Sequence, residues 1–110
     1  MSKYIAEILR GMGIPSYYLK RPQDIEECIV YSFNEYKGHM ADNTEETIKY
    51  DCYFNIMISS NISSTINKMK SILESNGFRK IVINSPMIIE GVDLYQITMN
   101  FQKYMAKNTI

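Results

Sequence analysis

Histidine and cysteine are the residues of this chain whose side chains most often act as nucleophiles, bases or metal ligands. The sequence holds one histidine, His39, and two cysteines, Cys28 and Cys52. A Ser–His or Cys–His pair needs a histidine held firmly beside its nucleophile, whereas His39 stands in a segment rich in Gly, Asp and Asn that predicts a loop. Zinc sites use closely spaced Cys and His ligands, and the sequence has no such spacing. We therefore expect no catalytic site, no metal site and no cofactor.

The acidic pairs and the glycines do not change this expectation. Glu26-Glu27 and Glu45-Glu46 are adjacent residues, which point to opposite sides of an extended segment and so do not converge as an acid and a base would. The glycines fit neither a GxGxxG nor a P-loop pattern. Nine tyrosines and eight methionines are typical of packing and contact surfaces. The sequence thus predicts a protein that is not an enzyme.

Length and charge narrow the class of protein further. The 110 residues fit one domain over 1–110. Lys plus Arg is 12 and Asp plus Glu is 12, and this neutral balance argues against nucleic acid as the main partner. Cys28 and Cys52 lie in segments that predict strands, so we expect two buried thiols in a reducing compartment, with a disulfide between neighbouring strands as the alternative. No stretch of about 18 apolar residues predicts a membrane span, and no export signal is expected.

Spacings of three and four between apolar residues predict two amphipathic helices. The first covers Tyr4–Met12 with Ser2 as its N-cap, and Gly11 or Gly13 ends it. The second begins among the hydroxyl side chains of 59–64 and ends at Asn76-Gly77. Each helix has one apolar side with which to cover a sheet.

Period-two alternation predicts the strands, most clearly from Ile48 to Ile58, where every even position is apolar. The order α-β-β-β-α-β-β predicts an α+β fold, with a mixed or antiparallel sheet of about four to five strands and two helices on one face. The other face should be polar. The expected strands are Ser16–Leu19, Cys28–Tyr36, Ile48–Ile58, Phe78–Asn84 and Leu94–Tyr104, with Lys37–Glu45 as a hairpin loop and Ser85–Asp93 as a connection.

Five apolar side chains fall outside the core that this alternation builds. Tyr53 and Met57 interrupt the polar face of the long strand, where they would touch another subunit or a packed loop. Met87, Ile88 and Ile89 form an apolar triplet in the last connection. If exposed, the triplet favours a protein contact, and a loop folded back on the core is the alternative. These five residues are the candidate subunit-interface residues.

Several local patterns occur in a recognisable succession. In chain order they are IPSYYLKRPQ at Ile14–Gln23, IVYSFNEYKG at Ile29–Gly38, ADN at Ala41–Asn43, MKSILESNGFRK at Met69–Lys80 and DLYQITMNFQ at Asp93–Gln102. In these patterns and in its order of elements, the chain resembles the tail terminator, or tail completion, proteins of long-tailed bacteriophages and related phage-like particles. The resemblance extends over nearly the whole chain and rests on arrangement rather than on catalytic motifs.

This resemblance implies a structural role in virion assembly. Such proteins form a ring, commonly a hexamer, on the head-proximal end of the tail tube, stop its polymerisation and provide the surface for head attachment. The implied partners are further copies of the chain, the tail tube protein and a head-completion or neck protein, and DNA passes through the lumen without sequence-specific binding. The implied location is the host cytoplasm during assembly and then the head–tail interface of the virion.

Lateral contacts in such a ring could come from the hairpin at Asn34–Lys49 and the triplet Met87–Ile89. Two alternatives stay open at this point. One is a head–tail joining (neck) protein of the same kind of particle, which would differ in its binding partner. The other is a small ligand-binding regulatory domain of ferredoxin-like type, which a stabilising metabolite would reveal.

Overall fold

The computed structural model describes residues 1–21, 23, 27–40 and 46–106. Two α-helices, a short 3₁₀ turn (Arg10–Met12) and six strands make up an α+β fold, as predicted, with more strands than expected. The strands form one mixed sheet in the order β1-β2-β3-β6-β4, and β5 also pairs with β6. The elements are α1 (Ser2–Leu9), β1 (Ser16–Tyr18), β2 (Cys28–Met40), β3 (Glu46–Ile58), α2 (Ile62–Ser75), β4 (Arg79–Ile83), β5 (Met87–Ile89) and β6 (Leu94–Ala106).

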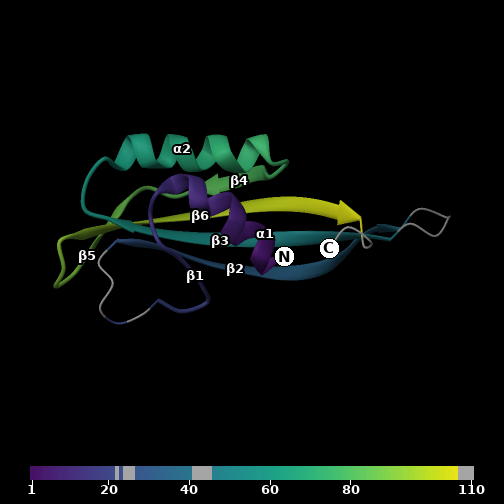
Figure 1. Cartoon of the computed structure of the whole chain (residues 1–110), viewed down its shortest axis with the longest axis horizontal. Helices are drawn as coiled ribbons and strands as arrows, with labels where there is room; N and C mark the ends of the chain where they lie inside the picture. Colours follow the sequence, from purple (N-terminus) through teal and green to yellow (C-terminus); the bar gives the residue numbers. More distant parts are fainter. Residues whose placement is uncertain (22, 24–26, 41–45, 107–110) are drawn as a thin grey trace.

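The sheet is built around β3, which pairs antiparallel with β2 on one side and with β6 on the other. These three strands have 13 residues each, and they give the molecule its elongated form of 53 × 24 × 23 Å. β1 is parallel to β2, whereas β4 and β5 are antiparallel to β6. Figure 1 shows the long strands running along the molecule with α2 lying over them.

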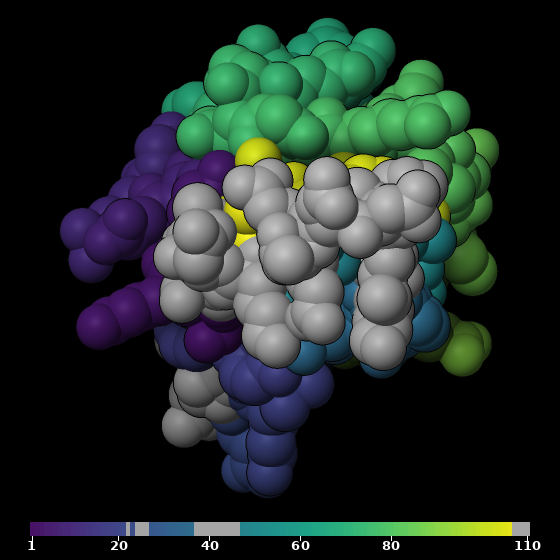
Figure 2. All heavy atoms as spheres, turned by 90° about the vertical axis from the view of Figure 1, so that its right-hand side faces the viewer, coloured from purple at the N-terminus to yellow at the C-terminus, as the bar shows by residue number. Residues whose placement is uncertain are grey.

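The core lies between the sheet and the two helices. The even-numbered residues of β3 from Tyr50 to Ile58 are buried, which confirms the alternation seen in the sequence. Ile5 and Leu9 of α1 and Met69 and Leu73 of α2 belong to the same cluster, so both helices cover one face of the sheet. In the end-on view of Figure 2, α2 lies along the top of the molecule and the N-terminal helical segment lies beside it at the left. Each such buried aliphatic side chain contributes about 1.5–3 kcal/mol.

The C-terminal ends of both helical segments lie at glycines, as the sequence predicted. Gly13 has φ +72° and ends the N-terminal helical segment, and Gly77 has φ +86° just after α2. The prediction of Ser2 as an N-cap is wrong. The carbonyl of Met1 already accepts the N–H of Ile5 at 3.0 Å, so α1 starts at Ser2 with Met1 at the cap and no side-chain cap bond.

Two predicted connections contain strand instead. Lys37–Met40 was expected in a loop but extends β2, because the strand continues to pair with β3 across a register shift between Lys37 and Met40. The rest of that predicted loop, 41–45, lies outside the described residues. Met87–Ile89 was expected in a connection but forms β5, whose three residues pair with the start of β6.

Candidate subunit interface

The outer face of the sheet, which the helices leave uncovered, carries the charged residues Lys49, Asp51 and Arg79 and a group of neutral polar side chains that bond to one another. The Asn84 side-chain amide donates to Thr98 Oγ1 at 2.7 Å, and the Gln96 amide donates to Asn55 Oδ1 at 3.2 Å. These bonds link β3, β6 and the residue that follows β4. The outer face is therefore polar, as predicted, and its amides hold one another in place.

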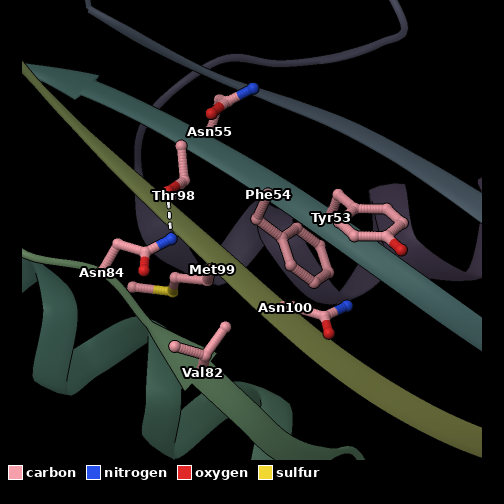
Figure 3. Close-up of a pocket in the computed structure, with 8 residues that line it drawn as sticks. All are labelled: Tyr53, Phe54, Asn55, Val82, Asn84, Thr98, Met99 and Asn100. Atoms are coloured by element: carbon pink, nitrogen blue, oxygen red, sulfur yellow. Dashed lines mark hydrogen bonds between the residues drawn. The ribbon is translucent and has the colours of Figure 1, made fainter.

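An open hollow of about 350 Å³ lies on this face (Figure 3). Asn100 stands beside it and donates to the backbone carbonyl of Cys52 at 3.1 Å. The hollow is lined by Tyr53, Phe54, Asn55, Val82, Asn84, Thr98, Met99 and Asn100. Amides, one hydroxyl and one phenol provide hydrogen bonds and contact area but neither a general base nor a nucleophile with a partner. The hollow therefore presents hydrogen-bonding groups beside apolar side chains.

Tyr53 and Met57 leave β3 on this same face, but the structure treats them differently. Tyr53 is 41% exposed and stands at the hollow. Met57 is only 9% exposed and packs in a small second cluster with Cys28 and Leu94. The Arg21 guanidinium also lies 3.5 Å from the Met57 sulfur. Of the two, only Tyr53 is available to a partner in the isolated chain.

The apolar triplet is also divided. Met87 is 68% and Ile88 is 77% exposed on β5, whereas Ile89 is half-buried against the second cluster. β5 lies at the opposite end of the molecule from the C-terminal end of β2 (Figure 1). Met87 pairs with Gln96 and Ile88 with Tyr95, so these two adjacent side chains lie on opposite faces of the sheet, and each exposes apolar surface there.

Both cysteines are buried and unbonded, as expected, and the alternative disulfide is absent. Burial and, to a smaller extent, the neighbouring Asp51 carboxylate raise the pKa of the Cys52 thiol to about 12. Burial also raises the pKa of Cys28, although Arg21 opposes this effect. Because the thiolate is the reactive form, these two thiols are packed side chains rather than nucleophiles.

Two sheet edges are the features that reading the sequence missed. At one edge, β4 has no neighbour on the side away from β6 within the described part of the chain, and it exposes Arg79, Lys80, Ile81 and Val82. At the other edge, β1 covers β2 only from Ile29 to Tyr31. Unpaired edges expose backbone N–H and C=O groups that can pair with another chain. No local sequence signal marks an edge, because strand order is set by distant contacts.

Two further findings concern the described residues alone. They contain no group of three or more His, Cys, Asp or Glu side chains placed to hold a metal ion. None of the helices in this part of the chain has the length and apolar character to cross a membrane.

Comparison with known proteins gives a likeness of fold. No protein-family model matches the chain, and no curated protein sequence matches it. Among solved structures, it is similar to a chain in the virion of a native gene transfer agent particle, with a TM-score of 0.56 and 12% sequence identity. The similarity covers 92% of this chain and 85% of that one. The two chains therefore share a fold over most of their length despite their divergent sequences.

Proposed function

We propose that this chain is a structural subunit of a virion and, more specifically, a tail terminator. In this role, copies form a ring on the head-proximal end of the tail tube, stop its growth and present a surface for head attachment. The observation that carries the proposal is the fold shared, over 92% of this chain, with a chain of a gene transfer agent virion. The sequence resemblance to tail terminator proteins, found independently of that likeness, supports the same role.

The surfaces of the chain fit a subunit that is contacted on several sides. Exposed apolar residues lie at one end of the molecule on β5, and a polar face with Tyr53 lies across the sheet. Within the described residues, the sheet ends in two different edges, β4 on one side and β1 with the uncovered part of β2 on the other. A ring needs unlike patches that meet head to tail, and a cap needs a further surface for the tube. We assign the β5 residues Met87 and Ile88 to contact with another virion protein.

The proposal accounts for termination by geometry alone. A subunit that binds the tube end through one surface, and its own copies through two others, forms a closed layer. Further tube subunits are excluded because the exposed side of this layer differs from the tube end. Such a process requires no reaction and no cofactor.

The test is deletion of this reading frame in a strain that produces the particle, with tail length and head attachment scored by electron microscopy. We expect tails of irregular, excessive length that stay unattached to heads. Complementation with the intact frame should restore normal particles, whereas Ile88→Glu should not. Val92→Glu, also at an exposed apolar residue in the turn after β5, is the matched control and should restore them.

Other outcomes would move the assignment. Tails of uniform length beside filled, unjoined heads would make the chain a head–tail joining protein. Intact, infectious or transfer-competent particles without the chain would refute both roles. A metabolite that raises the melting temperature of the purified chain would then favour the ligand-binding regulatory domain.

A further inference from the structure

The two edges that the described residues leave open on the sheet have directions that suit an antiparallel pair. β4 has five residues, Arg79–Ile83, and β1 leaves β2 uncovered from Ser32 to Met40, of which Ser32–Tyr36 are the first five residues. β2, β3, β6 and β4 alternate in direction because each pairs antiparallel with the next. If a second copy continued the sheet, its β2 would therefore run antiparallel to β4 of the first.

Charge distinguishes the two edges. β4 exposes Arg79 and Lys80, whereas Glu35 is the only charged residue in the Ser32–Tyr36 stretch of β2 and is exposed. A contact between two β4 edges would bring like charges together, which is destabilising between facing strands. A contact between a β4 edge and a β2 edge brings opposite charges together. Complementarity thus favours a head-to-tail contact between copies, and contacts of this type close into rings or extend as filaments.

The faces of the side chains then fix the register. Lys80 pairs with Phe101 and Glu35 pairs with Tyr50, both buried on the helix-covered face, so Lys80 and Glu35 also belong to that face. With these two residues opposite each other, Arg79 lies beside Tyr36 of the next copy. This pair belongs to the outer face, because Arg79 pairs with Gln102 and Tyr36 with Lys49.

The irregularity in β4 preserves this match. The register between β4 and β6 shifts between Lys80 and Val82, which leaves Ile81 as the extra residue. If Ile81 is also left unpaired against β2 of the next copy, Ile83 lies opposite Phe33 of that copy. Both residues belong to the helix-covered face. One register therefore satisfies charge, face and bulge together.

We propose that β4 of one copy pairs with the uncovered Ser32–Tyr36 stretch of β2 in the next copy, with Lys80 opposite Glu35 of that copy. This inference rests on the proposed ring and names its lateral contact. The contact combines main-chain hydrogen bonds, which give affinity, with one charge pair that sets the register. The alternative role for Lys80 and Arg79 is to protect an unpaired sheet edge against pairing with another chain. The experiments below distinguish this protective role from a lateral contact.

The test uses charge reversal in the purified chain, with the oligomeric state measured by analytical ultracentrifugation. Lys80→Glu and Glu35→Lys should each weaken association by about tenfold, because an attractive cross-strand pair becomes repulsive. An equimolar mixture of the two variants should regain it. In the mixture, the glutamate introduced at position 80 on β4 of one variant meets the lysine introduced at position 35 on β2 of the other, which are opposite charges. The unchanged Glu35 of the first variant and Lys80 of the second also attract each other, so the two variants alternate in the assembly. Lys68→Glu and Glu74→Lys, exposed on α2, are the matched controls and should associate like the wild type.

The mixture also separates an interface effect from a folding effect. Glu35 accepts a hydrogen bond from the Tyr50 hydroxyl at 2.9 Å within its own chain, so Glu35→Lys could weaken the fold. A folding defect would not be repaired by adding the other variant. If Lys80→Glu strengthens association instead, Lys80 protects the edge and the proposal is overturned.

A second measurement covers a chain that associates weakly. The double variant Lys80→Cys, Glu35→Cys should give a ladder of disulfide-linked oligomers on oxidation, because directly opposed residues of facing strands lie close enough for a disulfide. The native cysteines are buried and should give no ladder alone. A double variant that yields no ladder overturns the inference. If rings form and neither reversal disturbs them, the lateral contact is wrong while the terminator role stands; if tails are normal without the chain, the terminator role itself fails.

Discussion

The side chain of Lys103 joins the end of β6 to the end of α2, and its removal should be costly. Its ammonium donates to the backbone carbonyl of Asn76 at 2.6 Å, where α2 ends. The same ammonium lies 5.5 Å from the ring centre of Tyr4 and 5.4 Å from that of Phe78. A cation at a helix C-terminus is favoured by the helix dipole. Lys103 therefore holds α1, α2 and β6 together at one point.

The perturbation that isolates this role is Lys103→Met, which keeps an unbranched apolar side chain and removes the charge. A hydrogen bond from a charged donor contributes about 1.5–3 kcal/mol, and each cation–π contact adds about 0.5–1 kcal/mol. The Tyr4 hydroxyl also donates to the Asn76 carbonyl at 3.2 Å, so that carbonyl keeps a partner and the loss is smaller than the sum. We expect the free energy of unfolding to fall by about 2 kcal/mol, with a decrease in Tm of about 10 °C for a domain of this size.

The assay is urea unfolding followed by circular dichroism. The midpoint should fall while the m-value stays unchanged, because the same surface is exposed on unfolding. Lys68→Met on the exposed side of α2 is the control and should stay within about 0.5 kcal/mol of the wild type. If Lys103→Met also stays within that range, the ammonium does not stabilise the junction and the reasoning is wrong.

Three further predictions concern the same fold. Gly77→Ala should lower the free energy of unfolding by about 1 kcal/mol more than Gly91→Ala. Both glycines have positive φ, but only at Gly77 would the new methyl lie 2.6 Å from the Lys103 ammonium and displace it. Equal losses in urea unfolding would contradict this. Burial and then the hydrogen bond to Glu35 raise the pKa of Tyr50 from 10.0 to about 12. The stabilisation by the neutral Tyr50 hydroxyl is therefore complete below pH 10 and is lost as the pH rises towards 12. The stability advantage of the wild type over Tyr50→Phe should shrink between pH 10 and 12 and nowhere below. Hydrogen bonds from the backbone N–H and then the hydroxyl of Ser59 lower the pKa of Glu27 below 4.5. Glu27→Gln should therefore lower the free energy of unfolding by about 0.5 kcal/mol near neutral pH and leave it unchanged in acid well below pH 4.5. Unfolding midpoints measured over a series of pH values would detect this difference.

Sequence periodicity predicted the elements in which buried and exposed positions alternate regularly along the chain. The even positions of β3 are apolar because they all face the helices, and that face is visible in the sequence as well as in the structure. β5 was missed for a physical reason. It has three residues and follows Pro86, so it is too short to show a period. The extension of β2 through Lys37–Met40 was missed because Gly38 and its polar neighbours have a loop-like composition, whereas pairing with β3 determines their conformation.

The candidate interface was only partly accessible to sequence reasoning. Tyr53, Met87 and Ile88 stand out as apolar residues in polar surroundings, and the structure exposes all three. Glu35 and Lys80 do not stand out, because an exposed charge is ordinary wherever it falls. Their significance depends on strand order, which places them at opposite edges of one sheet. That order arises from contacts between distant segments, and no local pattern encodes it.

The most direct test of the central claim is electron cryo-microscopy of intact particles that contain this chain. The proposal predicts a closed ring of its copies at the head-proximal end of the tail tube, between the last tube layer and the proteins that join the head. In that ring, β4 of each copy should lie beside β2 of the next. Particles in which this chain is absent, or in which it occupies the head shell or the distal tail tip, would contradict the claim.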